Sequence, residues 1–134
     1  MTTCSRWDIV LVPFPFTDMT AVKRRPALVV SPDTSNRTGP DLVIAFLTSH
    51  VHADPRSGDY RLQAWQEAGL PKPTMLRMKF ATVARSVVIK TIGRVAETDR
   101  SAIRDAFMTF FTVKILCKKA RIAEKNRLRQ SKRE

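Results

Sequence analysis

Short apolar runs separated by proline and glycine are the feature that most constrains how this chain can fold. These runs cover Asp8 to Phe14, Ala27 to Ser31, Asp41 to Thr48, Met75 to Val83 and Ser86 to Gly93. They are rich in Val, Ile, Leu and Thr, which favours β-strands, and the residues between them favour turns over crossover helices. The pattern therefore predicts an α+β fold that is mainly β, a small and strongly curved antiparallel β-barrel with a C-terminal helix.

The helix is expected to begin near Thr98, a suitable N-cap, with Asp99 on the favourable end of the helix dipole. An apolar stripe follows at spacings i, i+4, i+7 and i+8, and it predicts core packing onto the sheet. The stripe consists of Ile103, Phe107, Phe110 and Phe111. A short helical or looped insert around Leu62 to Gly69 is left open.

Size and charge narrow the class of protein. The chain has 134 residues, enough for one domain that buries roughly two-thirds of its unfolded surface. Its net charge of +12 indicates an anionic partner. Residues 114–134 hold nine Lys or Arg and two Glu, a net of +7 that leaves +5 for residues 1–113. The sequence thus predicts a barrel domain over 1–113 and a basic helical or disordered tail over 114–134, either a solvated helix end or an arm that attracts phosphate.

Cysteine usage and hydropathy indicate where the protein works. Cys4 and Cys117 lie far apart without metal-ligand spacing, which suits a reducing compartment and leaves a disulfide between them open. No apolar run approaches the roughly 20 residues of a membrane span, and no signal-like segment begins the chain. We therefore expect a cytoplasmic protein with no membrane partner.

The dipeptide Arg25-Pro26 is the strongest candidate for a site. Proline fixes its own φ and pushes the preceding residue toward extended geometry, so Arg25 is predicted at a loop-to-strand junction. Its guanidinium offers five donors in a rigid fork that suits phosphate oxygens. The alternative is a surface Arg paired with a carboxylate such as Asp18. Lys23 and Arg24 come just before and would either steer a phosphate backbone or form a solvated loop edge.

The segment from His50 to Asp54 has the HxHxD pattern of metallohydrolase zinc sites. These are the chain's two histidines, and no further Cys or His cluster completes a ligand set, so no metal and no cofactor are expected. His50 lies two residues after Thr48 and would supply an acid or base, unless it is simply exposed in a polar loop.

Several segments in order resemble the MazF/PemK toxins over about residues 6 to 113. They are WDIVLVPFPFTD, KRRPALVVS, AFLTS, GDYRL, AGLPKPT, ATV and IGRV. The resemblance implies an SH3-like barrel, a homodimer that cleaves single-stranded RNA without a metal and is held inactive by an antitoxin. The catalytic Arg of the family corresponds to Arg25, and its catalytic Thr or Ser to Thr48, with Ser49 beside it. Many members have Gly-Asp where this chain has Trp7-Asp8, and the tail has no familiar counterpart.

The implied reaction uses the ribose 2′-OH as the nucleophile and leaves 2′,3′-cyclic phosphate and 5′-OH ends. Arg25 suits stabilisation of the extra negative charge, because arginine stays protonated, and Thr48 would donate its hydroxyl to a phosphate oxygen. Further RNA contacts are expected from basic and aromatic side chains around the groove. These are Lys23, Arg24, Ser49, Lys72, Arg77, Lys79 and Trp65.

Three functions follow from these features. The preferred one is a growth-inhibiting endoribonuclease toxin that cuts mRNA at short sequences, with an acidic and partly disordered antitoxin as its partner. The second is a non-catalytic toxin of the same fold that inhibits a protein such as a topoisomerase. The third is a nucleic-acid-binding regulator that acts through its tail.

Overall fold

The protein is mainly β, with one long helix at its C-terminal end. The computed structural model describes residues 3–14, 23–52 and 54–133, with side chains beyond residue 112 described for 125–127 alone. Its strands are β1 (Asp8–Phe14), β2 (Lys23–Val29), β3 (Asp41–Thr48), β4 (Tyr60–Arg61), β5 (Met75–Ala84) and β6 (Lys90–Arg94). Its helices are α1 (Asp33–Thr38), the 3-10 turn η1 (Arg85–Val87) and α2 (Glu97–Arg133).

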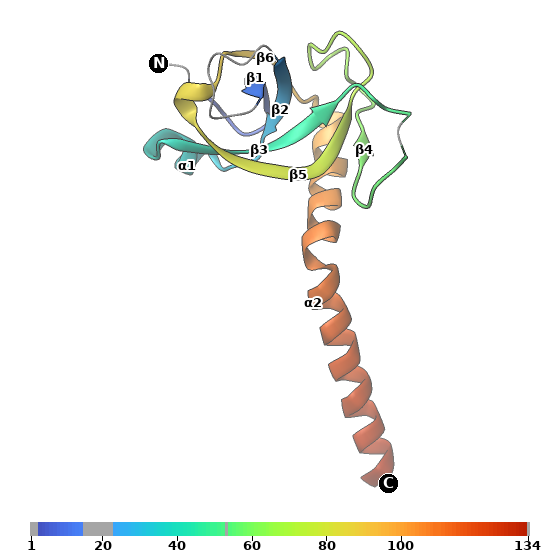
Figure 1. Cartoon of the computed structure of the whole chain (residues 1–134). Coiled ribbons are helices and arrows are strands. Elements are labelled where there is room, and N and C mark those ends of the chain that lie inside the picture. The colour runs from blue at the N-terminus through green and yellow to red at the C-terminus, as the bar shows by residue number, and fades with distance from the viewer. Residues whose placement is uncertain (1–2, 15–22, 53, 134) are drawn as a thin grey trace.

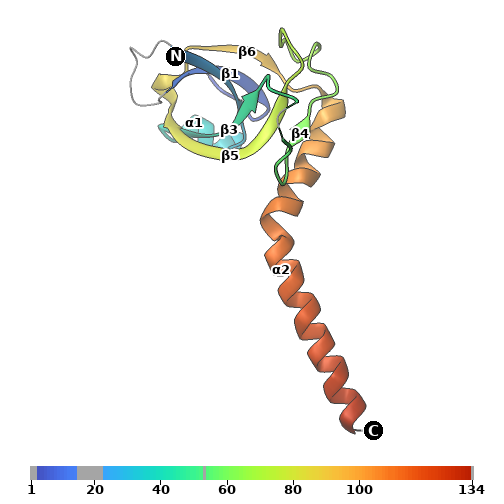
Figure 2. The same ribbon diagram turned by 45° about the vertical axis from the view of Figure 1, so that its right-hand side comes forward.

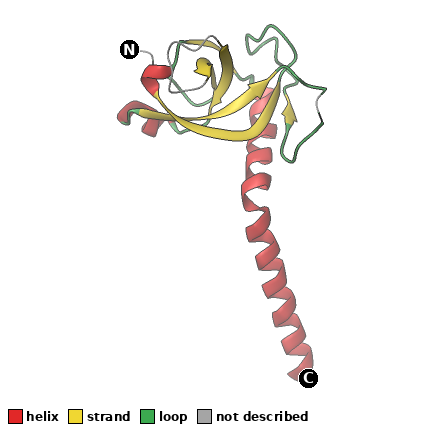
Figure 3. Cartoon of the chain, viewed as in Figure 1, coloured by secondary structure: helices red, strands yellow, loops and turns green. Residues whose placement is uncertain are grey.

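The six strands form one antiparallel sheet in the order β4-β5-β3-β2-β1-β6. The sheet curls into a half-barrel, and α2 leaves it at one end as a continuous rod (Figures 1 and 2). Figure 3 shows the division between the yellow sheet and the red helix. The expected fold class, a small antiparallel barrel with a C-terminal helix, is confirmed.

Strand β2 begins at Lys23, earlier than the predicted Ala27, so Arg25 and Pro26 lie inside a strand and not at a loop-to-strand junction. The first half of β2 pairs with β1, whereas pairing with β3 begins at Ala27. A proline is tolerated there because its missing N–H falls on a stretch whose second edge is unpaired.

Two short elements, helix α1 and strand β4, were not predicted. Residues 63–69 form turns, which is the looped one of the two alternatives left open for that segment. The run Ser86–Gly93 is divided between η1 and β6. Elements of two to six residues carry too few side chains for a periodic apolar pattern, so long-range contacts decide them.

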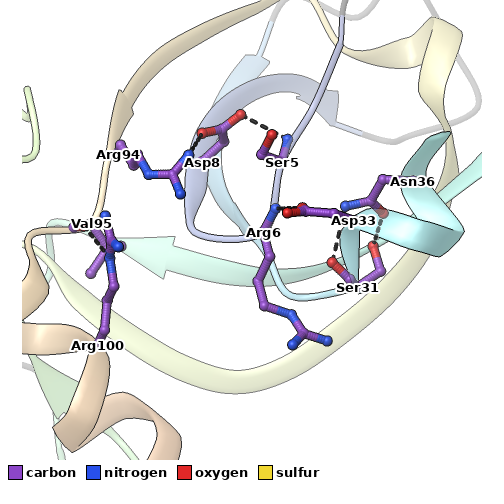
Figure 4. Close-up of polar contacts among 9 residues, drawn as sticks. All are labelled: Ser5, Arg6, Asp8, Ser31, Asp33, Asn36, Arg94, Val95 and Arg100. Carbon is purple, nitrogen blue, oxygen red and sulfur yellow. Dashed lines mark hydrogen bonds and ion pairs between the residues drawn. The ribbon is translucent and has the colours of Figure 1, made fainter.

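Side-chain hydrogen bonds hold α1 in place (Figure 4). The hydroxyl of Ser31 donates to the Oδ1 of Asn36 at 2.5 Å, and the Nδ2 of Asn36 donates to the carbonyl of Ser31 at 3.0 Å. The N-terminal segment is tied to the same region, because the amide of Arg6 donates to Asp33 at 2.7 Å. Asp8 accepts from the amide of Ser5 at 2.9 Å and from Arg94 at 3.3 Å. These contacts anchor the start of β1.

Trp7 has a φ of 79°, in the left-handed region that favours glycine. Many members of the MazF/PemK family, which the sequence resembles, carry Gly at this position. Its amide donates to Val29 at 3.0 Å and its carbonyl accepts from Val95 at 2.9 Å, and its indole packs on the core. Packing and these two bonds offset a backbone cost of about 1–2 kcal/mol.

The core has two buried clusters, one on each side of the curl. The first consists of Ile9, Leu28, Ala45, Leu47, Leu62, Ala68, Leu70, Leu76, Val95 and Ile103. The second consists of Cys4, Val10, Val12, Ala27, Val29, Leu42, Ile44, Val83 and Val88. Cys4 is a buried free thiol whose pKa is raised, first by burial and then by Asp8. The side chain of Cys117, the other cysteine of the predicted alternatives, lies outside the described side chains.

Helix α2 begins at Glu97, one residue before the predicted start, and meets the sheet through its first turns. Ile103 is fully buried and Phe107 packs against the first cluster, as predicted. The prediction was wrong for the rest of the stripe, because Phe110 is 40% and Phe111 58% exposed. The helix leaves the barrel at this point. The ring of Phe111 still contacts that of Phe80, with 5.3 Å between the two ring centroids.

Asp99 fastens the start of α2 to the loop that follows β4. It is fully buried and accepts hydrogen bonds from the hydroxyl of Tyr60 at 2.6 Å and from the amides of Gln63 and Ala64 at 3.0 and 2.9 Å. Burial and then Asp99 raise the pKa of Tyr60 to about 12. Asp99 therefore does more than complement the helix dipole: it satisfies two loop amides.

No helix in the described part of the chain combines the length and hydropathy needed to cross a membrane.

Candidate functional site: a cationic pocket where β2 and β3 separate

The site begins where β2 and β3 part. The pairs Ala27↔Phe46, Leu28↔Ala45 and Val29↔Ile44 advance by one residue on each strand. Arg25 and Thr48 each lie two residues beyond the last of these pairs, where the strands are no longer joined by a ladder. Both side chains predicted as catalytic line the opening between the strands.

A pocket of about 440 Å³ lies at this opening. We call it the first pocket. Its polar and charged lining consists of Lys23, Arg24, Arg25, Thr48, Ser49, His50, Lys72 and Thr74. Its apolar lining consists of Leu11, Pro26, Leu47, Leu70, Pro71 and Ile92. Four cations and three hydroxyls with no carboxylate in the lining suit an anionic ligand.

Arg25 is half-buried, and its guanidinium lies over the ring of Phe14 with 5.3 Å to the ring centroid. Its Nε is buried and has no hydrogen-bond partner among the described residues. Those residues include no carboxylate in ion-pair distance of Arg25. The alternative partner Asp18 lies outside the described residues. A buried donor without a partner is costly, and a phosphate oxygen would satisfy it.

The hydroxyl of Thr48 caps the turn that follows β3, because it accepts a hydrogen bond from the amide of His50 at 3.1 Å. Its hydrogen is then available to donate into the pocket. His50 is exposed and lines the same pocket, whereas His52 and Asp54 are exposed and do not line it. Among the described residues no three His, Cys, Asp or Glu side chains cluster closely enough to hold a metal ion.

A second pocket of about 240 Å³ shares Arg25, Leu47 and Thr48 with the first. The rest of its lining consists of Phe14, Phe46, Arg56, Arg77 and Lys79. Arg25 and Thr48 therefore stand on a wall between two cationic pockets.

The structure brings most of the predicted site residues to these pockets. The predicted residues that line the first pocket are Lys23, Arg24, Arg25, Thr48, Ser49, His50 and Lys72. Two further predicted residues, Arg77 and Lys79, line the second pocket. Trp65 lines neither pocket and packs against the first core cluster. The Pro71-Lys72-Pro73 segment, recognisable in the sequence as a turn, brings Lys72 to the first pocket.

Sequence reasoning missed three side chains of the second pocket: Phe14, Phe46 and Arg56. Both phenylalanines lie in apolar runs that predict strand core, and Arg56 follows Pro55 in a loop. An indication was present in the sequence for Phe14 alone. Aligning the two adjacent antiparallel runs pairs Val12 with Arg25 and Phe14 with Lys23, which brings Phe14 close to Arg25.

Fold and site together define a small barrel protein with a cationic, hydroxyl-lined pocket suited to a polyanion. The chain belongs to the family of PemK-like, MazF-like toxins of type II toxin–antitoxin systems, whose sequence profile matches residues 5–111. This confirms the family resemblance seen in the sequence. A comparison with curated proteins found no match.

Solved structures share the fold at low identity. One is an endoribonuclease in complex with its cognate antitoxin from a mycobacterial species, 17% identical, covering 81% of this chain and 93% of that chain with a TM-score of 0.64. Another is the Mycobacterium tuberculosis toxin MazF-mt6, 17% identical, covering 78% and 95% with a TM-score of 0.63. A third is MazE-MazF from Deinococcus radiodurans, 18% identical, covering 83% and 97% with a TM-score of 0.64.

Proposed function

We propose that this toxin is an endoribonuclease that cuts single-stranded RNA at the wall formed by Arg25 and Thr48. The observation that carries the proposal is that Arg25 and Thr48 line the same two pockets, with a buried Arg25 Nε that lacks a hydrogen-bond partner among the described residues. Endoribonuclease is also the activity named for similar structures. A toxin that acts by blocking a protein would need neither side chain in this arrangement.

The chemistry follows from what the pocket offers. The ribose 2′-oxygen attacks the adjoining phosphorus and loses its proton, the bond from phosphorus to the 5′-oxygen breaks, and that oxygen takes up a proton. The products are a 2′,3′-cyclic phosphate and a 5′-OH. Arg25 stabilises the negative charge that builds on the phosphoryl oxygens, and Thr48 donates its hydroxyl to one of them. His50, an imidazole in the same pocket, is the candidate for moving protons.

RNA binding is distributed over the surrounding cations. Lys23, Arg24 and Lys72 surround Arg25 in the first pocket without a carboxylate among its lining residues. They bind the backbone, which adds affinity and sets the register without reading sequence. Ser49 adds a hydroxyl beside Thr48. Sequence choice then depends on side chains that reach base edges.

Partners follow from charge and exposed apolar surface. An antitoxin with an acidic, partly disordered segment suits the net charge of +12, and two of the similar structures contain an antitoxin. A second copy of the chain would cover Met108, Phe110 and Phe111, which are 59%, 40% and 58% exposed on α2. The site of action is the cytoplasm, where mRNA is present.

The test is cleavage of a long single-stranded RNA in EDTA, with chemical analysis of the ends. The native chain should cut at discrete positions and leave 5′-OH ends. Thr48→Val, which keeps the shape and removes the hydroxyl, should cut more slowly. Arg37→Ala is the matched control, because Arg37 is an exposed Arg of α1 that lines neither pocket. Binding without cutting by the native chain would overturn the nuclease and favour a non-catalytic toxin.

A further inference from the structure

The second pocket is placed to receive the nucleotide that adjoins the reacting phosphate. It shares Arg25 and Thr48 with the first pocket, so a strand whose phosphate lies on that wall has one neighbour on each side. Its volume of about 240 Å³ is below the roughly 300–1,000 Å³ of small-molecule sites, which suits a single base or phosphate.

The second pocket lies beside a bulge in β5. Ala45 pairs with Phe80 and Leu47 with Leu76, so three residues of β5 lie opposite Phe46 alone. Two of these three residues, Arg77 and Lys79, line the pocket. Bulges recur next to functional sites because they redirect side chains out of the regular alternation.

Contacts hold three of the four cations of this pocket, Arg25, Arg77 and Lys79. The ammonium of Lys79 lies over the ring of Phe46, 5.4 Å from its centroid, as Arg25 lies over Phe14. Arg77 faces the carboxylate of Asp59 at 3.7 Å, and the Asp59 side chain is 4% exposed. That separation is too long for a hydrogen bond, and the buried NH1 of Arg77 has no hydrogen-bond partner among the described residues. The guanidinium of Arg77 thus pairs with Asp59 by charge and keeps an N–H that no described residue accepts.

The four cationic side chains of the lining, from Arg25, Arg56, Arg77 and Lys79, donate hydrogen bonds and cannot accept them, whereas the hydroxyl of Thr48 can do both. The carboxylate of Asp59, which faces Arg77, does not line the pocket. Such a lining favours a base edge rich in acceptors. Guanine offers O6 and N7 on one edge, and uracil offers O4 at the position where cytosine carries its amino group. Cytosine and adenine present an amino group, which would face other donors.

We infer that the second pocket is a base-reading subsite, in which Arg77 and Lys79 select a keto-bearing base, guanine or uracil, next to the scissile phosphate. This inference rests on the proposed RNA-cleaving function for the identity of the polymer. A phosphate of the backbone would also satisfy the donors, but it would carry no base preference, and the test separates the two.

The test compares binding of ten-nucleotide oligouridylate and oligocytidylate made with 2′-deoxyribose, which attack by a 2′-OH cannot cut. The two probes have the same length and charge and differ in a carbonyl against an amino group. The native full-length chain should bind the uridylate at least about fivefold more tightly, the lower end of one good base contact. Equal affinities would overturn the inference.

Substitution assigns the preference to the pocket. Lys79→Gln replaces an exposed donor by an amide that also accepts, so the uridylate-to-cytidylate ratio should fall toward one. Lys90→Gln is the control, because Lys90 is an exposed lysine of β6 outside both pockets. An equal loss of affinity for both probes in Lys79→Gln would assign the contact to the backbone and overturn base reading.

The two proposals fail separately. A native chain that cuts RNA without discriminating the probes loses the subsite and keeps the nuclease. A chain that discriminates the probes and never cuts RNA loses the nuclease and keeps the subsite.

Discussion

The two ends of strand β2 illustrate opposite uses of the same sheet. Ala27 and Leu28 pair on both edges of the strand, and the side chains from Ala27 to Val29 are fully buried. From Lys23 to Pro26 the strand pairs with β1, and its charged side chains line a pocket. The paired end stabilises the fold, as does the junction at which Asp99 accepts hydrogen bonds from Tyr60 and two loop amides. The unpaired end keeps donors free for a ligand, so substitutions at the two ends should affect different measurements.

The largest effect is expected at the unpaired end. Arg25→Ala should lower the single-turnover rate of RNA cleavage by about 10³–10⁵, the range for an arginine that stabilises a transferring phosphoryl group. Thermal unfolding should change little, because the removed Nε is a buried donor without a partner among the described residues. Cleavage that survives in a folded Arg25→Ala protein would erase the distinction between the two ends.

Leu28→Ala tests the paired end. Leu28 is fully buried in the first core cluster, so its truncation should lower the free energy of unfolding by about 2–5 kcal/mol in urea denaturation. Lys23→Ala on the same strand is the control and should stay within about 0.5 kcal/mol, because Lys23 is exposed. Similar losses in both variants would show that the two ends do not differ in their contribution to stability.

Tyr60→Phe tests how much the Asp99 junction stabilises the fold, because the substitution removes the hydrogen bond from Tyr60 to Asp99. We expect a loss of about 1–2 kcal/mol, at the low end for a bond to a charged group because Tyr60 is half-buried. The pKa of Tyr60 is raised from 10.0 to about 12, so its contribution is complete below pH 10 and is lost as pH rises through 12.

Urea denaturation at several pH values checks this dependence. Tyr60 is the chain's single tyrosine, so its ionisation can be followed by absorbance. The stability difference between the native chain and Tyr60→Phe should shrink between pH 10 and 12. A stability difference that stays constant over this interval would contradict a stabilising hydrogen bond between Tyr60 and Asp99.

The smallest effect is expected from the tail. Replacing Lys118, Lys119 and Arg121 by Gln removes three of the nine cations of residues 114–134. The salt dependence of RNA binding should become less steep, by up to about 0.7 in slope for each phosphate that the tail no longer neutralises. The cleavage rate at saturating RNA should not change. A collapse of that rate would move the centre of activity from the pocket to the tail.

The sequence predicted the part of the fold that local pattern determines. The bounds of β1 and β3 follow directly from their apolar runs. The sequence also predicted Arg25 and Thr48 as site residues, and the structure brings both to the end where β2 and β3 part. Family resemblance carried the assignment of Thr48, because an isolated threonine at a strand end is ordinary.

The second pocket could not be predicted, because its residues come from separate strands and one loop. Arg77 and Lys79 lie in a bulge of β5 opposite Phe46, and the sequence does not indicate where extra residues enter a ladder. The exposure of Phe111 could not be predicted for a related reason. A helical stripe shows which face is apolar, and not where the sheet beneath it ends.

The most direct test uses one short RNA that contains a mapped cut site, and a copy with a single 2′-deoxyribose on the 5′ side of the cut. Single-turnover cleavage in EDTA should occur in the all-ribose strand and vanish at that position in the copy, with binding of the two strands unchanged. Cutting of the deoxy copy at the same position and rate would contradict attack by the 2′-OH on the wall of Arg25 and Thr48.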